Sequence, residues 1–123
     1  MTPTLLIVDD HAAFRSTARA LLELDGWDVV GEAADATSGI SAAKSLKPDV
    51  VLLDVRLPDL DGFAVAEQLT AAAGGPAVIV TSSSDDPLYP ERALSTGACG
   101  FVAKHDLSGA ALYRLLGDAA PPA

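Results

Sequence analysis

Short apolar runs recur along the chain and alternate with longer segments of helical periodicity, and this alternation constrains the fold more than any other feature. The runs are Thr4 to Val8, Val50 to Leu53, Ala77 to Val80 and Gly100 to Ala103, with the weaker run Trp27 to Val30 as a fifth. Each run is continuously apolar, as is typical of parallel strands that helices bury on both faces. Strict alternation of strands and helices predicts a doubly wound α/β fold, with a five-stranded parallel sheet and helices on both faces.

The segments between the runs predict five helices. In the first, apolar residues recur at helical spacing from Phe14 to Leu22, Asp10 is expected to cap the N-terminus, and Gly26 is expected to end the helix. The other helices are expected at Ala36 to Leu46, Phe63 to Ala73, Pro90 to Thr96 and Leu107 to Leu116, the last of them near a Ser108 cap.

Length and composition predict one domain. The chain has 123 residues, half of them hydrophobic, so we expect a single core over residues 1–117 and a tail or linker stub at 118–123. A formal net charge of -9 argues against a surface for nucleic acids or anionic membranes, because both need clustered Lys and Arg. The opening apolar run is too short for a signal peptide and no stretch reaches membrane-spanning length, so a cytoplasmic protein is expected. Cys99 is the only cysteine, which excludes an internal disulfide.

Polar residues follow or end four of the predicted strands: Asp9 with Asp10, then Asp54, Thr81 and Lys104. Ligands of doubly wound sheets bind at the carboxyl ends of the strands, so these side chains are expected on one rim. At an effective dielectric of about 20, two carboxylates about 4 Å apart repel by about 4 kcal/mol. A hard divalent cation would compensate this repulsion, and Mg²⁺ suits a few carboxylates together with water and a phosphoryl oxygen.

The motifs taken together resemble the receiver domains of bacterial response regulators, which include chemotaxis regulators. The resemblance covers nearly the whole chain and implies a flavodoxin-like sheet of order 2-1-3-4-5. The matching residues are Asp9-Asp10, Asp54, Leu57 to Gly62, Thr81, Gly97-Ala98, Phe101 and Lys104.

The resemblance implies that Asp54 takes a phosphoryl group from a sensor histidine kinase or a phosphotransfer protein. It implies that Asp10, Asp54 and the backbone carbonyl of Arg56 bind Mg²⁺ directly, with Asp9 reaching the ion mainly through water. Such a domain is a signalling protein that catalyses only its own phosphorylation and dephosphorylation. Phosphoryl transfer mostly needs positioning and charge neutralisation, which agrees with this arrangement.

The resemblance also assigns a switch. Thr81 would hydrogen-bond the phosphoryl group, Lys104 would pair with it, and Phe101 would move with the threonine. The surface of the fourth helix, fifth strand and fifth helix would then change its affinity for a partner or form a homodimer. Arg56 and Ser83 occupy positions that modulate the lifetime of the phosphoryl group.

Each of these residues also has an ordinary interpretation. Alone, Asp10 would be a helix cap, Thr81 a turn residue, Lys104 a solvated lysine and Phe101 a core aromatic; only their coincidence on one rim favours the functional reading. The two histidines, His11 and His105, are interpreted as surface or loop residues because neither lies at a ligand-like spacing.

Three other functions fit the sequence less well. A haloacid-dehalogenase-like phosphohydrolase would need a second Asp two residues after the nucleophile, where this chain has Arg56. A nucleotide-binding module would need a glycine-rich phosphate loop, and none is present in the sequence. An interaction surface that is never phosphorylated would not need the full set of rim residues.

The sequence leaves the output of the domain open. The Lys104-His105 junction is similar to receivers that precede helix-turn-helix domains, and the segment Ala119 to Ala123 would suit a linker. A regulator that acts alone fits equally well. The cognate kinase, the signal, the target genes and the phosphoryl lifetime cannot be read from the chain.

Overall fold

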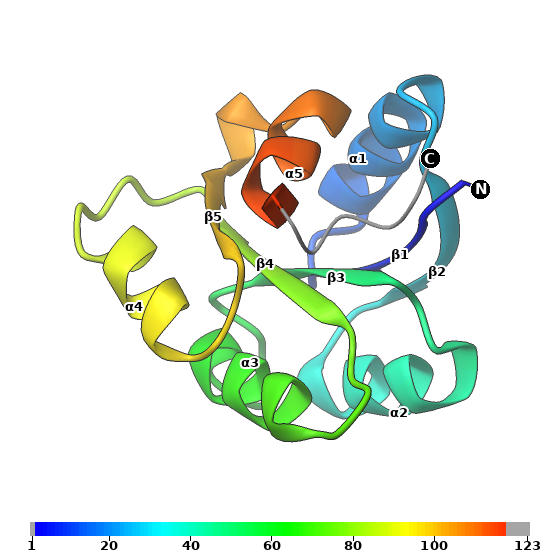
Figure 1. The fold of residues 1–123 in the computed structure, drawn as a ribbon. Coiled ribbons are helices and arrows are strands. Elements are labelled where there is room, and N and C mark those ends of the chain that lie inside the picture. The colour runs from blue at the N-terminus through cyan, green and yellow to red at the C-terminus, as the bar shows by residue number, and fades with distance from the viewer. Residues whose placement is uncertain (1, 118–123) are drawn as a thin grey trace.

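The computed structural model describes residues 2–117, so the predicted tail at 118–123 lies outside the described residues. Strands and helices alternate through this range (Figure 1). The strands are β1 (Thr4–Val8), β2 (Asp28–Ala33), β3 (Val50–Asp54), β4 (Ala77–Ser82) and β5 (Gly100–Ala103). The helices are α1 (Ala12–Leu24), α2 (Ala36–Leu46), α3 (Gly62–Ala71), α4 (Tyr89–Ser95) and α5 (Gly109–Leu116), with a short 3₁₀ turn, η1 (Lys104–Asp106), before α5.

All five strands are parallel and lie in the order β2-β1-β3-β4-β5. The strand order reverses beside β1, and the crevice at such a reversal is where ligands of this fold class bind. The register places Val8 beside Leu53 and Asp54 beside Thr81, so the polar residues that follow or end these strands meet at one edge. The predicted α/β fold and strand order are therefore confirmed.

The helices cover the two faces of the sheet separately, with α1 and α5 on one face and α2, α3 and α4 on the other (Figure 1). Side chains of β1 alternate between the two: Leu5 and Ile7 pack with the α1–α5 layer, whereas Leu6 and Val8 pack with the opposite layer. Both sets are fully buried, which explains why this strand is continuously apolar. Within the described residues, no helix combines the length and apolarity needed to cross a membrane.

The predicted cap of the first helix was wrong. The N-cap residue is His11, whose side chain makes no capping hydrogen bond, and the helix begins at Ala12. Asp9 Oδ1 instead accepts the His11 N–H at 2.8 Å, so the acidic pair lies in the turn between β1 and α1. Asp10 is left to face the rim.

The ends of other elements also differ from the predictions. The strand expected at Trp27 to Val30 runs from Asp28 to Ala33, and Trp27 precedes it as a buried side chain. The last helix begins at Gly109 rather than Leu107, because Lys104–Asp106 forms the 3₁₀ turn first. The Ser108 cap is confirmed, since its hydroxyl accepts the Ala111 N–H at 3.0 Å.

The loop from β3 to α3 folds back tightly behind the end of β3. Gly62 donates its N–H to the Val55 carbonyl at 2.7 Å, and a Cβ at this position would collide with the Asp54 carbonyl and the Val55 backbone. Only glycine permits such close approach of two backbones. Asp61 caps α3 by accepting the Phe63 N–H at 2.7 Å, which fixes the helix against the loop.

Candidate functional site

Three aspartates and a lysine converge at the carboxyl edge of the sheet. Asp9 and Asp10 follow β1, Asp54 ends β3 and Lys104 follows β5. Lys104 Nζ lies 2.6 Å from Asp9 Oδ2 and 3.7 Å from Asp54 Oδ2. The rim predicted from strand ends is therefore confirmed for these residues.

Asp54 carries a charge that is poorly compensated. The residue is only 3% exposed, and burial, with the nearby Asp9 carboxylate second, raises its pKa from 3.8 to about 6, although Lys104 acts in the opposite direction. A carboxylate that is destabilised in this way has affinity for an added cation or for a covalent group that removes its charge.

Asp9 is buried, and its two oxygens have different surroundings. Oδ1 accepts the His11 N–H and lies 3.1 Å from His11 Nδ1. Oδ2 faces Lys104 Nζ, but the contact lacks hydrogen-bond geometry and Oδ2 has no other partner among the described residues. The ammonium also lies over the Phe14 ring, 4.3 Å from its centroid, which adds a cation–π contact.

The donor set fits a hard divalent cation. One atom each from Asp9, Asp10, His11 and Asp54 can be chosen so that all four lie within 4.8 Å of one another. Three of these donors are carboxylate oxygens, the ligands that Mg²⁺ prefers, and the buried Asp9 Oδ2 and Asp54 both lack full compensation. The acidic cluster therefore has the donor types and proximity that suit a bound Mg²⁺.

Thr81 is buried beside Asp54, but its hydroxyl points to the neighbouring strand. Oγ1 donates a hydrogen bond to the Val102 carbonyl at 2.7 Å. Ser82 is also buried and accepts the Ser84 N–H at 3.0 Å, whereas Ser83 is exposed. For Thr81 to contact a group on Asp54, its hydroxyl must leave Val102.

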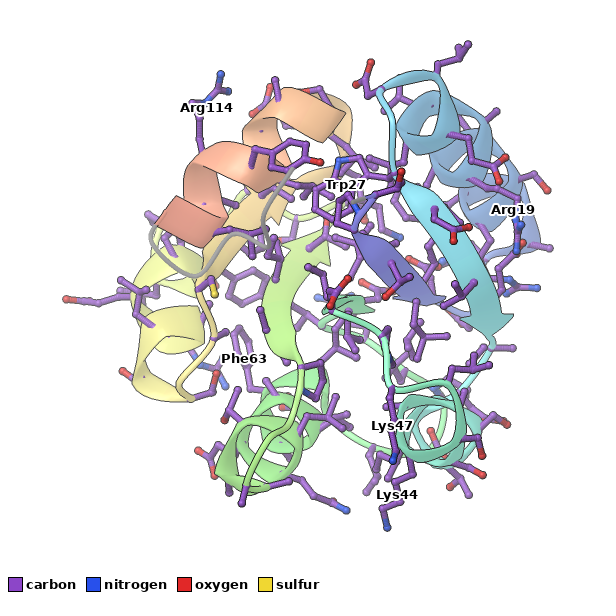
Figure 2. The ribbon with its side chains drawn as sticks, turned by 45° about the vertical axis from the view of Figure 1, so that its right-hand side comes forward. Arg19, Trp27, Lys44, Lys47, Phe63 and Arg114 are labelled. Atoms are coloured by element: carbon purple, nitrogen blue, oxygen red, sulfur yellow. The ribbon has the colours of Figure 1, made fainter. Side chains whose placement is uncertain are left out.

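Phe101 belongs to a line of aromatic rings that connects β5 with α4 and α3. Tyr89 packs edge-on against Phe101 with centroids 5.8 Å apart and against Phe63 with centroids 5.4 Å apart. The Arg92 guanidinium covers the Phe63 ring at 4.2 Å. Figure 2 shows Phe63 between α3 and α4. The contact with Tyr89 was not predicted, because nothing in the spacing links Tyr89 to Phe101.

The loop that carries Arg56 is anchored from a distance. Asp59 accepts hydrogen bonds from the backbone N–H of Ala36 and Thr37 and from the Thr37 hydroxyl, and these bonds lower its pKa to about 2. Arg56 pairs with Asp61 through a backbone bridge and exposes its side chain. The bridge and the anchor hold the Arg56 carbonyl in place.

Sequence reasoning missed three neighbours of the rim: His11, Phe14 and Arg15. His11 is an exposed residue before the first helix, as predicted, but its Nδ1 lies 3.0 Å from Asp10 Oδ1, a contact that was not predicted. The Arg15 guanidinium donates to the Asp9 carbonyl at 2.6 Å. All three lie within one and a half turns of the acidic pair, and that proximity was the available signal.

Comparisons with known proteins agree with one another. The family model of the response regulator receiver domain matches residues 5–112. A virulence-factor transcription regulator, BvgA of Bordetella pertussis, is 36% identical over 102 residues, covering 83% of this chain and 49% of the relative. A protein-glutamate methylesterase/protein-glutamine glutaminase of Anaeromyxobacter dehalogenans is 41% identical over 114 residues, covering 92% of this chain and 32% of the relative.

The signal receiver domain of the response regulator NarL from Mycobacterium tuberculosis has a similar structure. The TM-score is 0.83 at 33% identity, and the match covers 94% of this chain and 98% of that domain. The chain therefore matches the receiver domain over nearly all of its length but spans half or less of the two curated relatives.

Proposed function

The chain belongs to the family of response regulator receiver domains, and from this premise we propose that it accepts a phosphoryl group on Asp54 within a two-component system. The observation that carries the proposal is the convergence of three carboxylates and Lys104 at the carboxyl edge of the sheet. The donor is a phosphohistidine of a sensor histidine kinase or phosphotransfer protein.

In the transfer, an Asp54 carboxylate oxygen attacks the phosphorus atom of the phosphohistidine. The new O–P bond forms as the P–N bond breaks, and the released imidazole takes a proton from solvent. Lys104 can neutralise the charge of a phosphoryl oxygen during the transfer, because its Nζ is already 3.7 Å from Asp54 Oδ2. Forming the acyl phosphate also removes the buried carboxylate charge that raises the pKa of Asp54.

Mg²⁺ would be held by Asp10, Asp54 and the Arg56 carbonyl, with Asp9 acting mainly through water. When bound, it would supply positive charge to the equatorial phosphoryl oxygens. The hydrogen bonds from the N-terminus of α2 to Asp59 support this assignment. They hold the loop that contains Arg56 in place before the ion binds.

The phosphorylation site is tested by incubating the protein with acetyl phosphate and Mg²⁺ and mapping the modified residue by mass spectrometry. We expect one phosphoryl group on Asp54, with no incorporation in Asp54→Asn or in the presence of a chelator. Asp28→Asn is the matched control, because Asp28 is an exposed aspartate at the start of β2, remote from the rim. Undiminished labelling of Asp54→Asn would overturn the assignment.

Phosphorylation is proposed to act on the α4–β5–α5 surface through Thr81. The phosphoryl group competes with the Val102 carbonyl for the threonine hydroxyl, and movement of the hydroxyl makes room for Phe101 to turn inward. Arg56 and Ser83 lie two residues after Asp54 and Thr81, and they modulate the lifetime of the phosphoryl group. The changed surface binds an output partner, which for a chain spanning half of BvgA can be a further domain or a second copy.

Beryllofluoride, a stable stand-in for the phosphoryl group, tests this route. Amide signals from Thr81 through Leu116 should shift in NMR spectra of the parent protein, and the elution volume should report any homodimer. Thr81→Val keeps the shape of the side chain but lacks the hydroxyl, so its shifts should stay near the acidic pocket. Shifts confined to that pocket in the parent protein as well would exclude the proposed route.

A further inference from the structure

We propose that His11 is a nitrogen ligand of the metal site, which would make the site favour a first-row transition ion such as Co²⁺ or Mn²⁺ more strongly than carboxylates alone. This inference rests on the proposed function, because the ion is the one that serves Asp54.

The distances from His11 Nδ1 to the neighbouring carboxylate oxygens are those expected between two ligands of the same ion. Nδ1 lies 3.1 Å from Asp9 Oδ1 and 3.0 Å from Asp10 Oδ1. Ligands that bind an octahedral ion at about 2.1 Å and at right angles lie about 3.0 Å apart, because the separation is the bond length multiplied by the square root of two. The imidazole therefore already occupies a ligand spacing relative to both carboxylates.

A second observation shows that the cluster is incomplete without a cation. Asp9 is fully buried, and its Oδ2 has an ion pair with Lys104 Nζ at 2.6 Å but no hydrogen-bond partner among the described residues. Asp54 is also buried, and its nearest cation, Lys104 Nζ, lies at 3.7 Å. One donor atom from each of Asp9, Asp10, His11 and Asp54 lies within 4.8 Å of the others, so one bound ion would contact three acids and the imidazole together.

The chemistry of the donor decides which ions benefit. Imidazole nitrogen suits Zn²⁺, Ni²⁺ and Co²⁺; Mn²⁺ prefers oxygen ligands but accepts a nitrogen more readily than Mg²⁺, which keeps to oxygen ligands. The His11 side chain is 66% exposed, so it can turn toward an ion without repacking the core. Under Mg²⁺ alone the same imidazole only hydrogen-bonds the carboxylates, and this difference makes selectivity the property to measure.

Pulsed electron paramagnetic resonance of the Mn²⁺ complex detects a coordinated nitrogen directly. The chain has two histidines, so His105→Gln is a matched control in which the other exposed imidazole is removed. We expect nitrogen modulation in the parent protein and in His105→Gln, and its loss in His11→Gln. Absence of modulation in the parent protein, or its persistence in His11→Gln, would overturn the inference.

Metal affinities give an independent readout. In His11→Gln the dissociation constant for Co²⁺ should rise by about tenfold, as is typical when a ligand or its support is lost, whereas that for Mg²⁺ should change much less. An equal change for both ions would show that His11 acts through charge or folding and not as a nitrogen ligand. His11→Asn, a shorter amide, should behave as His11→Gln does.

Failure of this inference is distinct from failure of the proposed function. If the parent protein binds Mg²⁺ and is phosphorylated on Asp54 but shows no nitrogen coupling, only the His11 assignment is wrong. If it binds no divalent ion and takes no phosphoryl group, the proposed function itself is wrong.

Discussion

The two faces of the sheet differ in how firmly their helices are attached. On the α1–α5 side, Asp25 accepts the Gly109 N–H at 2.7 Å, the Trp27 indole donates to the Gly109 carbonyl at 3.4 Å, and Trp27 packs on Tyr113 with centroids 4.7 Å apart (Figure 2). These contacts join residues more than eighty positions apart in sequence. We call these contacts of Asp25 and Trp27 with α5 the frame, because they connect the N-terminal part of the chain to its last helix.

The α4 side is attached mainly by aromatic packing. This helix spans only seven residues, its N-cap residue Leu88 makes no capping hydrogen bond, and only Tyr89 and Ala93 are buried. Leu88 and Leu94 are 59% and 60% exposed. β5 contacts both regions, because Phe101 packs on Tyr89 of α4 and the 3₁₀ turn that follows the strand brings Lys104 to Asp9. The contrast indicates that α1 and α5 can stay fixed while α4 moves in response to a change at the rim.

Trp27→Ala should have the largest effect on stability, because it removes a buried aromatic ring from the frame. The free energy of unfolding should fall by about 3–5 kcal/mol in urea titrations followed by circular dichroism. Trp27→Phe keeps a ring at this position and should lose much less. A loss below about 1 kcal/mol for Trp27→Ala would show that the α1–α5 side is no more of a frame than α4.

Asp54→Asn should stabilise the protein by about 3 kcal/mol near pH 7, since a rise in pKa from 3.8 to about 6 reflects a penalty of that order for the buried charge. The folded state holds the proton more tightly than the unfolded state, so the penalty is absent below about pH 4, develops up to about pH 6 and is constant above it. Unfolding of both proteins in chelator across this range measures the difference.

Mg²⁺ should reduce the stability gain of Asp54→Asn, because the ion compensates the same charge in the parent protein. A gain that does not change between pH 4 and pH 7 would show that the burial of this carboxylate is not the cause. The charge of Asp54 would then not make the free energy of unfolding depend on pH.

Tyr89→Leu should destabilise the protein by about 1–2 kcal/mol, because it removes aromatic contacts with Phe63 and Phe101 but keeps an apolar side chain. Hydrogen exchange should locate the loss in α4, whose amides should open more readily than those of α5 even in the parent protein. Equal protection of the two helices would remove the proposed difference between the regions.

Arg92→Gln should have the smallest effect, about 0.5–1 kcal/mol, because it removes exposed cation–π contacts with Phe63 and, at longer range, with Tyr89. Arg114→Gln is the control on α5, where Figure 2 shows the arginine pointing away from the molecule. Thermal unfolding should leave Arg114→Gln within about 0.5 kcal/mol of the parent protein. Equal losses in the two variants would mean that Arg92 does not help to hold α4.

The sequence was most informative where one physical requirement dominates. The runs at Thr4 to Val8 and Val50 to Leu53 had to be strands, because both of their faces are buried and neither can be amphipathic. The edge strand β2 was placed less well, since Asp28–Ala33 has an exposed side and its pairing with β1 shifts register between Leu5 and Leu6. Its pattern is therefore mixed.

Side-chain orientation within the site was harder to predict than its membership. Parallel strand ends had to bring Asp9, Asp54 and Lys104 together, and they do. Whether Asp10 caps the helix or faces the rim depends on the turn at His11, whose backbone is set by the Asp9 hydrogen bond. The direction of the Thr81 hydroxyl likewise depends on a carbonyl of another strand.

The Thr81–Val102 hydrogen bond has a consequence for regulation by partners. If the phosphoryl group and the Val102 carbonyl share one hydroxyl, occupation of the active rim and the shape of β5 are linked equilibria. A phosphoryl-like ligand at the rim then raises the affinity for a partner that prefers the released β5. By reciprocity, the partner raises the affinity of the rim for that ligand by the same factor. The output partner would thus help to set how much of the domain is active, in addition to reading its state.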